Sequence, residues 1–145
     1  MHEIRTEIEI DAPIGRVWAA LSDFASYPSW NPFIPKLEGA PDVGSRLAVT
    51  IAPPGRKTMT FRPTLLEFAP ETRIRWLGRL WISGLFDGEH VHTLEALPAG
   101  GTRYRQTETF RGLLVGLARG TLKSTEEGFG QMNRALKARV EGTSV

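Results

Sequence analysis

The feature that most constrains the fold is a change of hydrophobic period near residue 113. Over 46–110, apolar residues alternate with polar ones in short segments that turn residues separate. Beyond it, apolar residues recur every three or four positions, as on one face of a helix: Phe129, Met132, Leu136 and Val140. A run of hairpins followed by one amphipathic helix predicts an α+β fold, with an antiparallel sheet packed on one face by that helix.

The N-terminal part of the chain is predicted to form one strand and two short helices. Over 3–10, isoleucines alternate with charged residues, which is typical of a half-buried strand. Asp11 as an N-cap and Pro13 in the first turn favour a short helix with Val17, Trp18 and Leu21 on its apolar side. Three prolines within 23–35 then allow only a broken turn or a short second helix, whose aromatic side chains pack inward.

About six further strands and a long terminal helix are expected after residue 36. The predicted strands cover 37–39, 46–52, 57–68, 72–80, 86–97 and 102–110, and the last two form a hairpin around the sequence PAGG. The helical pattern begins at about Leu113, although glycines leave open whether 112–120 is continuous helix.

Composition limits the classes of protein to which the chain can belong. Its 145 residues are expected to form one domain, 1–145, and the absence of cysteine excludes disulfides and thiolate metal sites. The N-terminus lacks a signal-peptide pattern, and no apolar run approaches the roughly 20 residues of a transmembrane segment, so we expect a cytoplasmic protein. A formal net charge of +2 is too small to argue for nucleic acid.

The sequence HVHTL at 90–94 places two histidines one residue apart in a predicted strand. Because strand side chains alternate, His90 and His92 should share the inner face with Gln106 and Glu108 of the next strand. The PAGG turn sets either His90 or His92 opposite Glu108. Three interpretations stay open: these groups pair to stabilise the hairpin, they hold the polar end of a ligand, or a His–Glu pair moves a proton.

No metal site is predicted in this cluster. The HxH pattern is similar to that of cupins, but the next carboxylate, Glu95, lies on the opposite strand face. Glu108 could complete a two-His, one-carboxylate set from the neighbouring strand. His2 is far away in sequence and no other inward ligand is evident, so neither a metal nor another cofactor is expected.

Small residues occur at four-residue intervals before and within the terminal helix, at Gly112, Gly116, Gly120, Ser124 and Gly128. Because an interior glycine costs a helix roughly 1 kcal/mol relative to alanine, so many need a compensation. They permit close approach to the sheet or leave empty volume beside it, and we favour a pocket wall over a dimer face. Charged neighbours argue against a membrane dimer motif.

Arginines on the outer strand faces raise the question of a nucleic-acid surface: Arg73, Arg75, Arg103, Arg105 and Arg111. Glutamates alternate with them on strands that are expected to be neighbours. Cross-strand ion pairs are therefore the simpler interpretation, and no nucleic-acid partner is predicted.

The order of elements resembles the START-like, or helix-grip, superfamily in its polyketide cyclase/dehydrase and lipid-transport branch. The matching motifs are IDAPIGRVWAALSDFASYPSWNPF at 10–33, FDGEHVHTLE at 86–95, GGTRYRQTETFRG at 100–112 and GFGQMNRALKARVE at 128–141. The resemblance implies a curved antiparallel sheet of about seven strands wrapped around the C-terminal helix, with two short helices between strands 1 and 2. It also implies a cavity for small, mostly apolar molecules, with the proline-rich segment around Trp30 and Phe33 at its entrance.

This resemblance, combined with strand parity, yields a set of expected ligand contacts. They are Trp30, Phe33, Met59, Phe61, Ile74, Trp76, Phe86, His90, His92, Gln106, Glu108, Leu117 and Phe129. For most of the apolar members, plain core packing is at least as good an explanation.

The expected function is to bind a small hydrophobic molecule: a lipid, a fatty acid, or an aromatic or polyketide-like compound. The alternative is a cyclase, dehydratase or aromatase in which His90, His92 and Glu108 are the candidate catalytic groups. A third alternative is a chaperone-like or toxin-type interaction module that holds a peptide in the same groove. The absence of a nucleophilic triad, phosphate loop or dinucleotide motif disfavours hydrolase and nucleotide chemistry. The sequence leaves open whether the protein is a monomer or a homodimer.

Overall fold

The computed structural model describes residues 1–79, 87–113 and 115–142, apart from the side chain of Leu117. The strands are β1 (His2–Ile10), β2 (Lys36–Glu38), β3 (Ala48–Ile51), β4 (Met59–Phe61), β5 (Thr64–Ala69), β6 (Arg73–Arg79), β7 (Asp87–Ala96) and β8 (Thr102–Arg111). The α-helices are α1 (Ile14–Ser22) and α2 (Arg119–Glu141), and the 3-10 helices are η1 (Phe24–Ser29) and η2 (Val115–Leu117). None of the helices in these ranges is long and apolar enough to cross a membrane.

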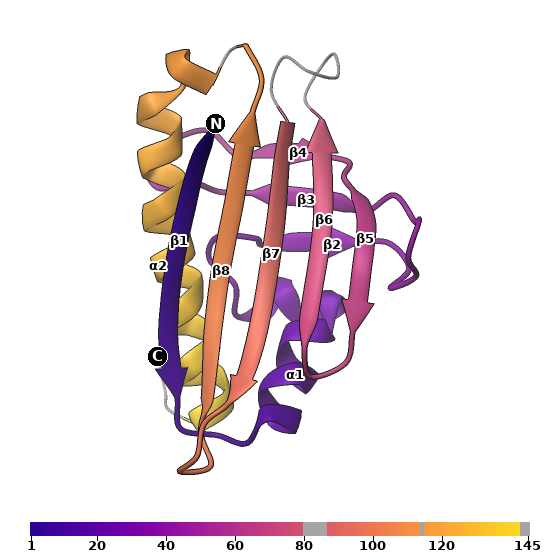
Figure 1. Ribbon diagram of the computed structural model, residues 1–145, viewed down its shortest axis with the longest axis vertical. Coiled ribbons are helices and arrows are strands. Elements are labelled where there is room, and N and C mark those ends of the chain that lie inside the picture. The colour runs from indigo at the N-terminus through magenta and orange to yellow at the C-terminus, as the bar shows by residue number, and fades with distance from the viewer. Residues whose placement is uncertain (80–86, 114, 143–145) are drawn as a thin grey trace.

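The strands form two antiparallel sheets that lie on either side of the core. The larger sheet has the order β1-β8-β7-β6-β5, and the smaller has the order β2-β3-β4. Figure 1 shows the long strands of the larger sheet in front, with α1, α2 and the crosswise strands of the smaller sheet behind them. The predicted α+β architecture with a curved sheet and a C-terminal helix is confirmed, but there are eight strands in the described residues instead of about seven.

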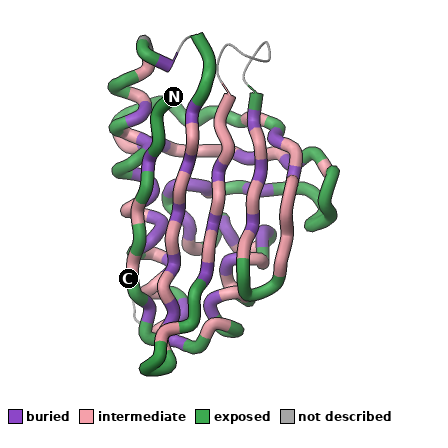
Figure 2. Tube along the Cα trace, in the orientation of Figure 1, coloured by how far each residue is buried: buried purple, intermediate pink, exposed green. Residues whose placement is uncertain are grey.

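The hairpin of β7 and β8 has the predicted side-chain parity. His90 pairs with Glu108 and His92 with Gln106, so the register places His90, not His92, opposite the carboxyl group. All four of these side chains are buried, whereas their odd-numbered neighbours are only partly buried. Figure 2 shows this alternation of buried and intermediate residues along the central strands.

The first helix begins two residues later than Asp11 capping would require. Its N-cap residue is Pro13, which forms no side-chain cap bond, and the backbone N–H of Asp11 instead donates to the Glu141 carboxylate of α2 (2.7 Å). Because the fixed φ of proline suits a helix start, Pro13 suffices to begin α1. The Glu141 bond joins the turn before α1 to the last residue of α2.

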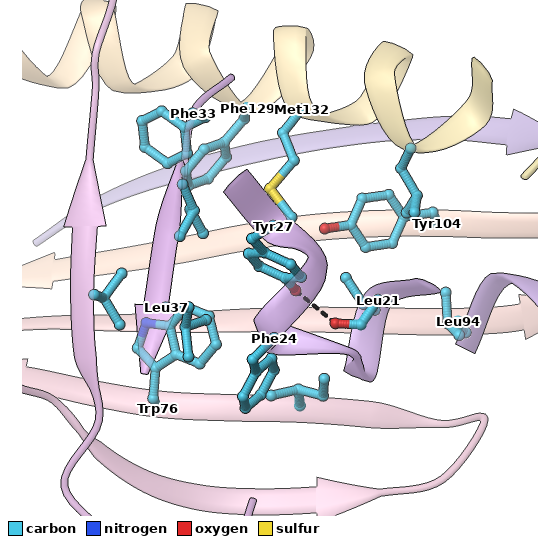
Figure 3. Packing of buried hydrophobic residues seen from close by; sticks show 14 of the residues in the cluster. Leu21, Phe24, Tyr27, Phe33, Leu37, Trp76, Leu94, Tyr104, Phe129 and Met132 are labelled. Carbon is cyan, nitrogen blue, oxygen red and sulfur yellow. Dashed lines mark hydrogen bonds between the residues drawn. The ribbon is translucent and has the colours of Figure 1, made fainter. Parts of the chain in front are cut away.

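Side-chain hydrogen bonds of Tyr27 and Asn31 direct the segment after α1 into the core. The Tyr27 hydroxyl donates to the backbone oxygen of Leu21 (2.5 Å), as Figure 3 shows. The Asn31 side-chain oxygen accepts from the backbone N–H groups of Phe33 (3.0 Å) and Ile34 (2.8 Å). This local turn fixes the direction in which Phe33 enters the core.

The predicted strand over 57–68 is wrong as a single element. The chain forms β4 and β5 instead, which pair with β3 and β6 respectively and therefore belong to different sheets. Pro63 lies at the break, and a proline cannot donate to a strand ladder.

The terminal helix begins at Arg119, not at about Leu113. Gly112 has a φ of 125°, which ends β8 in a conformation that other residues rarely adopt. The 3-10 turn of η2 follows, and α2 starts only after it. The question left open over 112–120 is thus answered: the segment is not continuous α-helix.

The close approach of α2 to the proline-rich segment depends on Gly128. A Cβ atom at this position would overlap the ring of Phe33. The Phe33 ring instead packs edge-on against Phe129, with ring centroids 5.4 Å apart, as the side-by-side rings in Figure 3 illustrate. Gly128 is therefore a packing residue of the core.

The outer face of the larger sheet carries the predicted cross-strand ion pairs. Arg75 bonds Glu89 (2.7 Å), Arg103 bonds Glu95 (2.6 Å), and similar pairs join Arg105 to Glu7 and Arg73 to Glu67. The signs alternate across neighbouring strands. The cross-strand pairs predicted for Arg73, Arg75, Arg103 and Arg105 are therefore present.

Candidate functional site

A cavity of about 70 Å³ lies between the two sheets and the N-terminal half of α2. Its lining is mainly apolar, and the titratable members among the described residues are His90 and Glu108. The lining residues are Phe33, Ile51, Met59, Phe61, Gly78, Gly88, His90, Glu108, Phe110, Thr121, Leu122 and Thr125. An apolar space with a few polar groups is the usual character of a small-molecule site.

Two glycines on neighbouring strands make room at the wall of this cavity. Gly78 of β6 and Gly88 of β7 are partners in the strand register. A Cβ atom on Gly88 would lie 2.7 Å from Oε2 of Glu108, and one on Gly78 would lie 3.2 Å from the Phe61 ring. The absence of side chains here therefore leaves space for the Glu108 carboxyl group and for the Phe61 ring.

A chain of hydrogen bonds fixes the orientation of His90. Gln106 Nε2 donates to the backbone oxygen of Phe129 (3.4 Å) and to Oδ1 of Asn133 (2.8 Å), and Asn133 Nδ2 donates to Oγ1 of Thr6 (3.0 Å). Because a backbone carbonyl can only accept, the amide nitrogen of Gln106 must face α2 and its oxygen must face His90. His90 Nε2 then carries a proton and donates to Gln106 Oε1 (2.8 Å).

This tautomer leaves Nδ1 of His90 as a hydrogen-bond acceptor on the side of Glu108. The distance from His90 Nδ1 to Glu108 Oε1 is 3.8 Å, which is too long for a hydrogen bond. Burial lowers the pKa of His90 to about 4 despite its bond to Gln106, so the imidazole is neutral at neutral pH.

The Glu108 carboxyl group is buried without a hydrogen bond to any residue in the described ranges. Its side chain is 11% exposed and lines the cavity. Burial raises its pKa to about 8, because the charged form loses its hydration. Glu108 is therefore a protonated carboxylic acid at neutral pH, with an O–H group available beside the cavity.

His92 lies deeper than His90 and does not line the cavity. Its Nδ1 is hydrogen-bonded to the Tyr104 hydroxyl (2.6 Å), and its Nε2 is buried with no partner among the described residues. The two imidazoles stack with centroids 4.2 Å apart, and Trp76 packs against both. Burial holds the pKa of His92 well below its usual range, so this ring is also neutral.

All of the expected ligand contacts except Trp30 fall into three groups. The structure places five in the cavity lining: Phe33, Met59, Phe61, His90 and Glu108. Five others are buried but lie outside the lining: Ile74, Trp76, His92, Gln106 and Phe129. Phe86 and the side chain of Leu117 lie outside the described residues.

Trp30, which was expected at the cavity entrance, is not among the described residues that line the cavity. Its ring packs against Tyr27 with centroids 5.1 Å apart, and its Nε1 donates to Oγ of Ser26 (3.1 Å). These local contacts hold the indole within the proline-rich segment. Phe33, from the same segment, does reach the lining.

Several residues that line the cavity were not among the ligand contacts predicted from the sequence. Strand parity could have identified Ile51 and Phe110, which alternate with polar neighbours. Thr121 and Thr125 lie one helical turn apart on α2, but an isolated pair of threonines carries no clear signal. Gly78 and Gly88 carried none, because a glycine that makes room for a side chain has no hydrophobic pattern of its own.

The four-residue stripe of small residues does not form one helix face. Gly112 and Gly116 precede α2, and the guanidinium group of Arg56 lies against Gly120. The pocket wall on α2 instead comes from Thr121, Leu122 and Thr125. No group of three or more potential metal ligands occurs in the part of the chain that the structure describes.

A second depression, of about 410 Å³, opens between η1 and β2. It shares no lining residue with the first cavity and contains neither histidine. Its two charged lining residues, Lys36 and Glu38, form an exposed ion pair at 3.7 Å. We therefore treat the cavity at Glu108 as the candidate site.

Comparison with known proteins places this geometry in a family. The sequence profile described as "Polyketide cyclase / dehydrase and lipid transport" matches residues 1–141. The chain belongs to this family. No curated protein sequence matches it significantly.

Solved structures of similar proteins share the fold of this polyketide cyclase/dehydrase and lipid-transport family member. TTHA0849 from Thermus thermophilus is 24% identical, with a TM-score of 0.75 over 99% of this chain and 100% of that one. A START superfamily protein from Mycobacterium smegmatis is 19% identical, with a TM-score of 0.75 over 98% and 99%. The di-domain ARO/CYC BexL is 15% identical, with a TM-score of 0.72 over 94% of this chain and 47% of that one. At these identities the likeness establishes the fold alone.

Proposed function

We propose that this protein binds a small hydrophobic ligand in the cavity between the sheets and α2, with the polar end of the ligand at Glu108. The observation that carries the proposal is a buried carboxyl group without a hydrogen bond in the described ranges, on the wall of an otherwise apolar space. A neutral carboxyl group on an apolar wall can donate one hydrogen bond to a ligand that enters the cavity. Such a bond would add to the burial of the apolar part of the ligand and would fix its polar end at Glu108.

Family membership supports the same proposal. Its description names lipid transport beside polyketide chemistry, and both involve hydrophobic molecules. We take the ligand class to be a lipid, a fatty acid, or an aromatic or polyketide-like compound. His90 contributes to the wall and holds its proton away from the cavity, while His92 and Gln106 support it from the core.

The test uses neutral aromatic probes of two sizes, toluene and naphthalene, titrated into the protein and followed by amide chemical shifts. Thr125→Leu adds carbon atoms to the cavity wall, because Thr125 is a buried lining residue. Ser124→Leu is the matched control, since Ser124 is adjacent on α2 but lies outside the lining.

The proposal predicts that toluene binds wild type and Ser124→Leu equally and that Thr125→Leu binds it at least about tenfold more weakly. Chemical denaturation of each variant confirms that it is folded. If neither probe binds the folded wild-type protein, or if Thr125→Leu leaves binding unchanged, the cavity is not a ligand site.

A second candidate function is proton transfer beside a ligand carbonyl group. The observation that favours it is the placement of a protonated acid, Glu108, 3.8 Å from the acceptor nitrogen of His90. In such a step Glu108 donates its proton to the carbonyl oxygen while His90 Nδ1 takes a proton from the adjacent carbon, which forms an enol. The di-domain ARO/CYC protein with the same fold makes this candidate worth a direct test.

Hydrogen–deuterium exchange at the methyl group of acetophenone in D₂O measures this activity without knowledge of the natural substrate. An enzyme of this kind accelerates the exchange over buffer, and Glu108→Gln abolishes the acceleration while acetophenone still binds. If acetophenone binds but the protein does not accelerate its exchange, the result supports the binding function and contradicts the proton-transfer function.

A further inference from the structure

The described residues that line the cavity carry no positively charged side chain. The polar groups of this lining in the described residues are two threonine hydroxyls, one imidazole and one carboxyl, and it includes neither lysine nor arginine. The Thr125 hydroxyl already donates to the backbone oxygen of Thr121 (2.8 Å). The donors left for a ligand are therefore the Glu108 acid and the Thr121 hydroxyl, while His90 Nδ1 and the Thr125 hydroxyl oxygen can accept.

The hydrogen-bond chain behind His90 determines what this site can offer. Because hydrogen bonds to α2 fix the orientation of Gln106, the N–H group of His90 donates to the side-chain oxygen of Gln106. The other ring nitrogen, Nδ1, faces Glu108 and can only accept a hydrogen bond. A neutral imidazole that presents a lone pair to the carboxyl group supplies no positive charge that would stabilise the carboxylate. Elements from both sheets and α2 surround the cavity, and none of their described lining residues supplies a cation.

We infer that this site selects uncharged ligands that carry a hydrogen-bond acceptor, such as a ketone or ester carbonyl, over carboxylates of the same shape. The inference rests on the proposed function and narrows it, since it excludes a fatty acid bound as its anion. A ligand carbonyl accepts the Glu108 O–H, whereas a ligand carboxylate brings a negative charge into an apolar space beside a second carboxyl group.

The protonation of Glu108 supports this selectivity. With its pKa raised to about 8, the acid holds its proton at neutral pH and loses it in mildly alkaline solution. Among the described lining residues, the other titratable group is His90, which is already neutral throughout that range. Selectivity for the carbonyl ligand should therefore fall as Glu108 ionises.

The test compares three molecules of nearly identical shape: acetophenone, benzoate and isopropylbenzene. At pH near 6.5, acetophenone is expected to bind wild type at least about tenfold more tightly than benzoate. Between about pH 6.5 and pH 9.5, acetophenone affinity should fall about fivefold to tenfold, while isopropylbenzene affinity stays constant. This measurement needs no variant, so it does not depend on the folding of a mutant.

Two substitutions at Glu108 separate hydrogen bonding from shape. Glu108→Gln retains a neutral donor and should keep acetophenone binding but lose its pH dependence. Glu108→Leu removes the donor and should weaken acetophenone about fivefold to tenfold relative to isopropylbenzene. Benzoate binding as tightly as acetophenone, or acetophenone affinity that does not change with pH, would overturn the inference while the cavity remains a ligand site. If none of the three binds, the proposed function itself fails.

Discussion

The carboxyl group of Glu108 faces the imidazole of His90 across strands β7 and β8, with 3.8 Å between Oε1 and Nδ1. Both groups are buried and both are neutral at neutral pH, because burial raises the pKa of the acid and lowers that of the imidazole. They are therefore not an ion pair. At 3.8 Å they are not hydrogen-bonded to each other either, so the Glu108 O–H stays available to a ligand.

The first prediction concerns stability in alkaline solution. The pKa of Glu108 is raised from 4.5 to about 8 on folding, so the folded state holds a proton that the unfolded state has lost in this range. Stability must then fall as pH rises, by about 1.4 kcal/mol per pH unit from Glu108 alone. Urea unfolding of wild type and Glu108→Gln between pH 6.5 and pH 8 measures this slope as the difference between the two proteins, because the histidines of the unfolded state also titrate in this range and contribute equally to both. Glu108→Gln should abolish the Glu108 contribution, and an unchanged slope in that variant would refute the assignment.

The second prediction concerns stability in acid. The histidines behave oppositely, since their pKa values are lowered on folding and the unfolded state binds their protons first. Stability must fall as pH decreases below 6.5, and it continues to fall toward the pKa of about 4 for His90. Replacing His92 and Tyr104 together by phenylalanine removes one titrating group with its partner. The acid slope should become shallower in the double variant, whereas Tyr104→Phe alone should retain the slope of wild type.

The third prediction compares two glycines on α2. A Cβ atom at Gly128 would overlap the Phe33 ring, so Gly128→Ala should destabilise the protein by roughly 1–3 kcal/mol. At Gly130 the nearest atom is the flexible end of Arg134, 3.3 Å away. Gly130→Ala should therefore stabilise the helix by up to about 1 kcal/mol. Thermal or urea unfolding distinguishes the two, and equal effects would contradict the packing described for Phe33.

The fourth prediction tests the space that glycine leaves for the carboxyl group. Because a Cβ atom at Gly88 would lie 2.7 Å from Glu108 Oε2, Gly88→Ala must displace that group. Acetophenone affinity should drop severalfold. Gly116→Ala is the control, since nothing lies within 4 Å of the added atom. Wild-type affinity in Gly88→Ala would show that the carboxyl position does not matter.

The fifth prediction concerns the outer face of the sheet. Arg105 and Glu7 form a partly exposed pair at 3.0 Å, and such pairs contribute well under about 1 kcal/mol. Arg105→Gln should change the free energy of unfolding by less than this amount, and added salt should shrink the difference further. A larger loss would indicate a role beyond the cross-strand pair.

Strand parity explains why the sequence predicts so much of this site. Alternation over 90–94 and 104–110 places His90, His92, Gln106 and Glu108 on one face, as observed. Parity alone could not decide which histidine opposes Glu108, because both choices keep every side chain on its face. That choice depends on the geometry of the PAGG turn, where Gly100 adopts a φ of 98°.

Other features depend on contacts that are distant in sequence. The division of 57–68 into two strands follows from Pro63 and from pairing with β3 and β6, which a local pattern does not reveal. The late start of α2 follows from the conformation of Gly112. The neutral state of Glu108 depends on its burial in a lining drawn from both sheets and α2, and only the folded chain brings these residues together.

The most direct test of the central claim is the location of a bound ligand. Intermolecular nuclear Overhauser effects between bound acetophenone and the protein report which side chains touch it. The account predicts contacts from the ligand to the methyl groups of Leu122 and Met59, with the carbonyl end nearest Glu108. Contacts confined to the depression at Phe24 and Leu37, or an absence of contacts at saturating ligand, would contradict it.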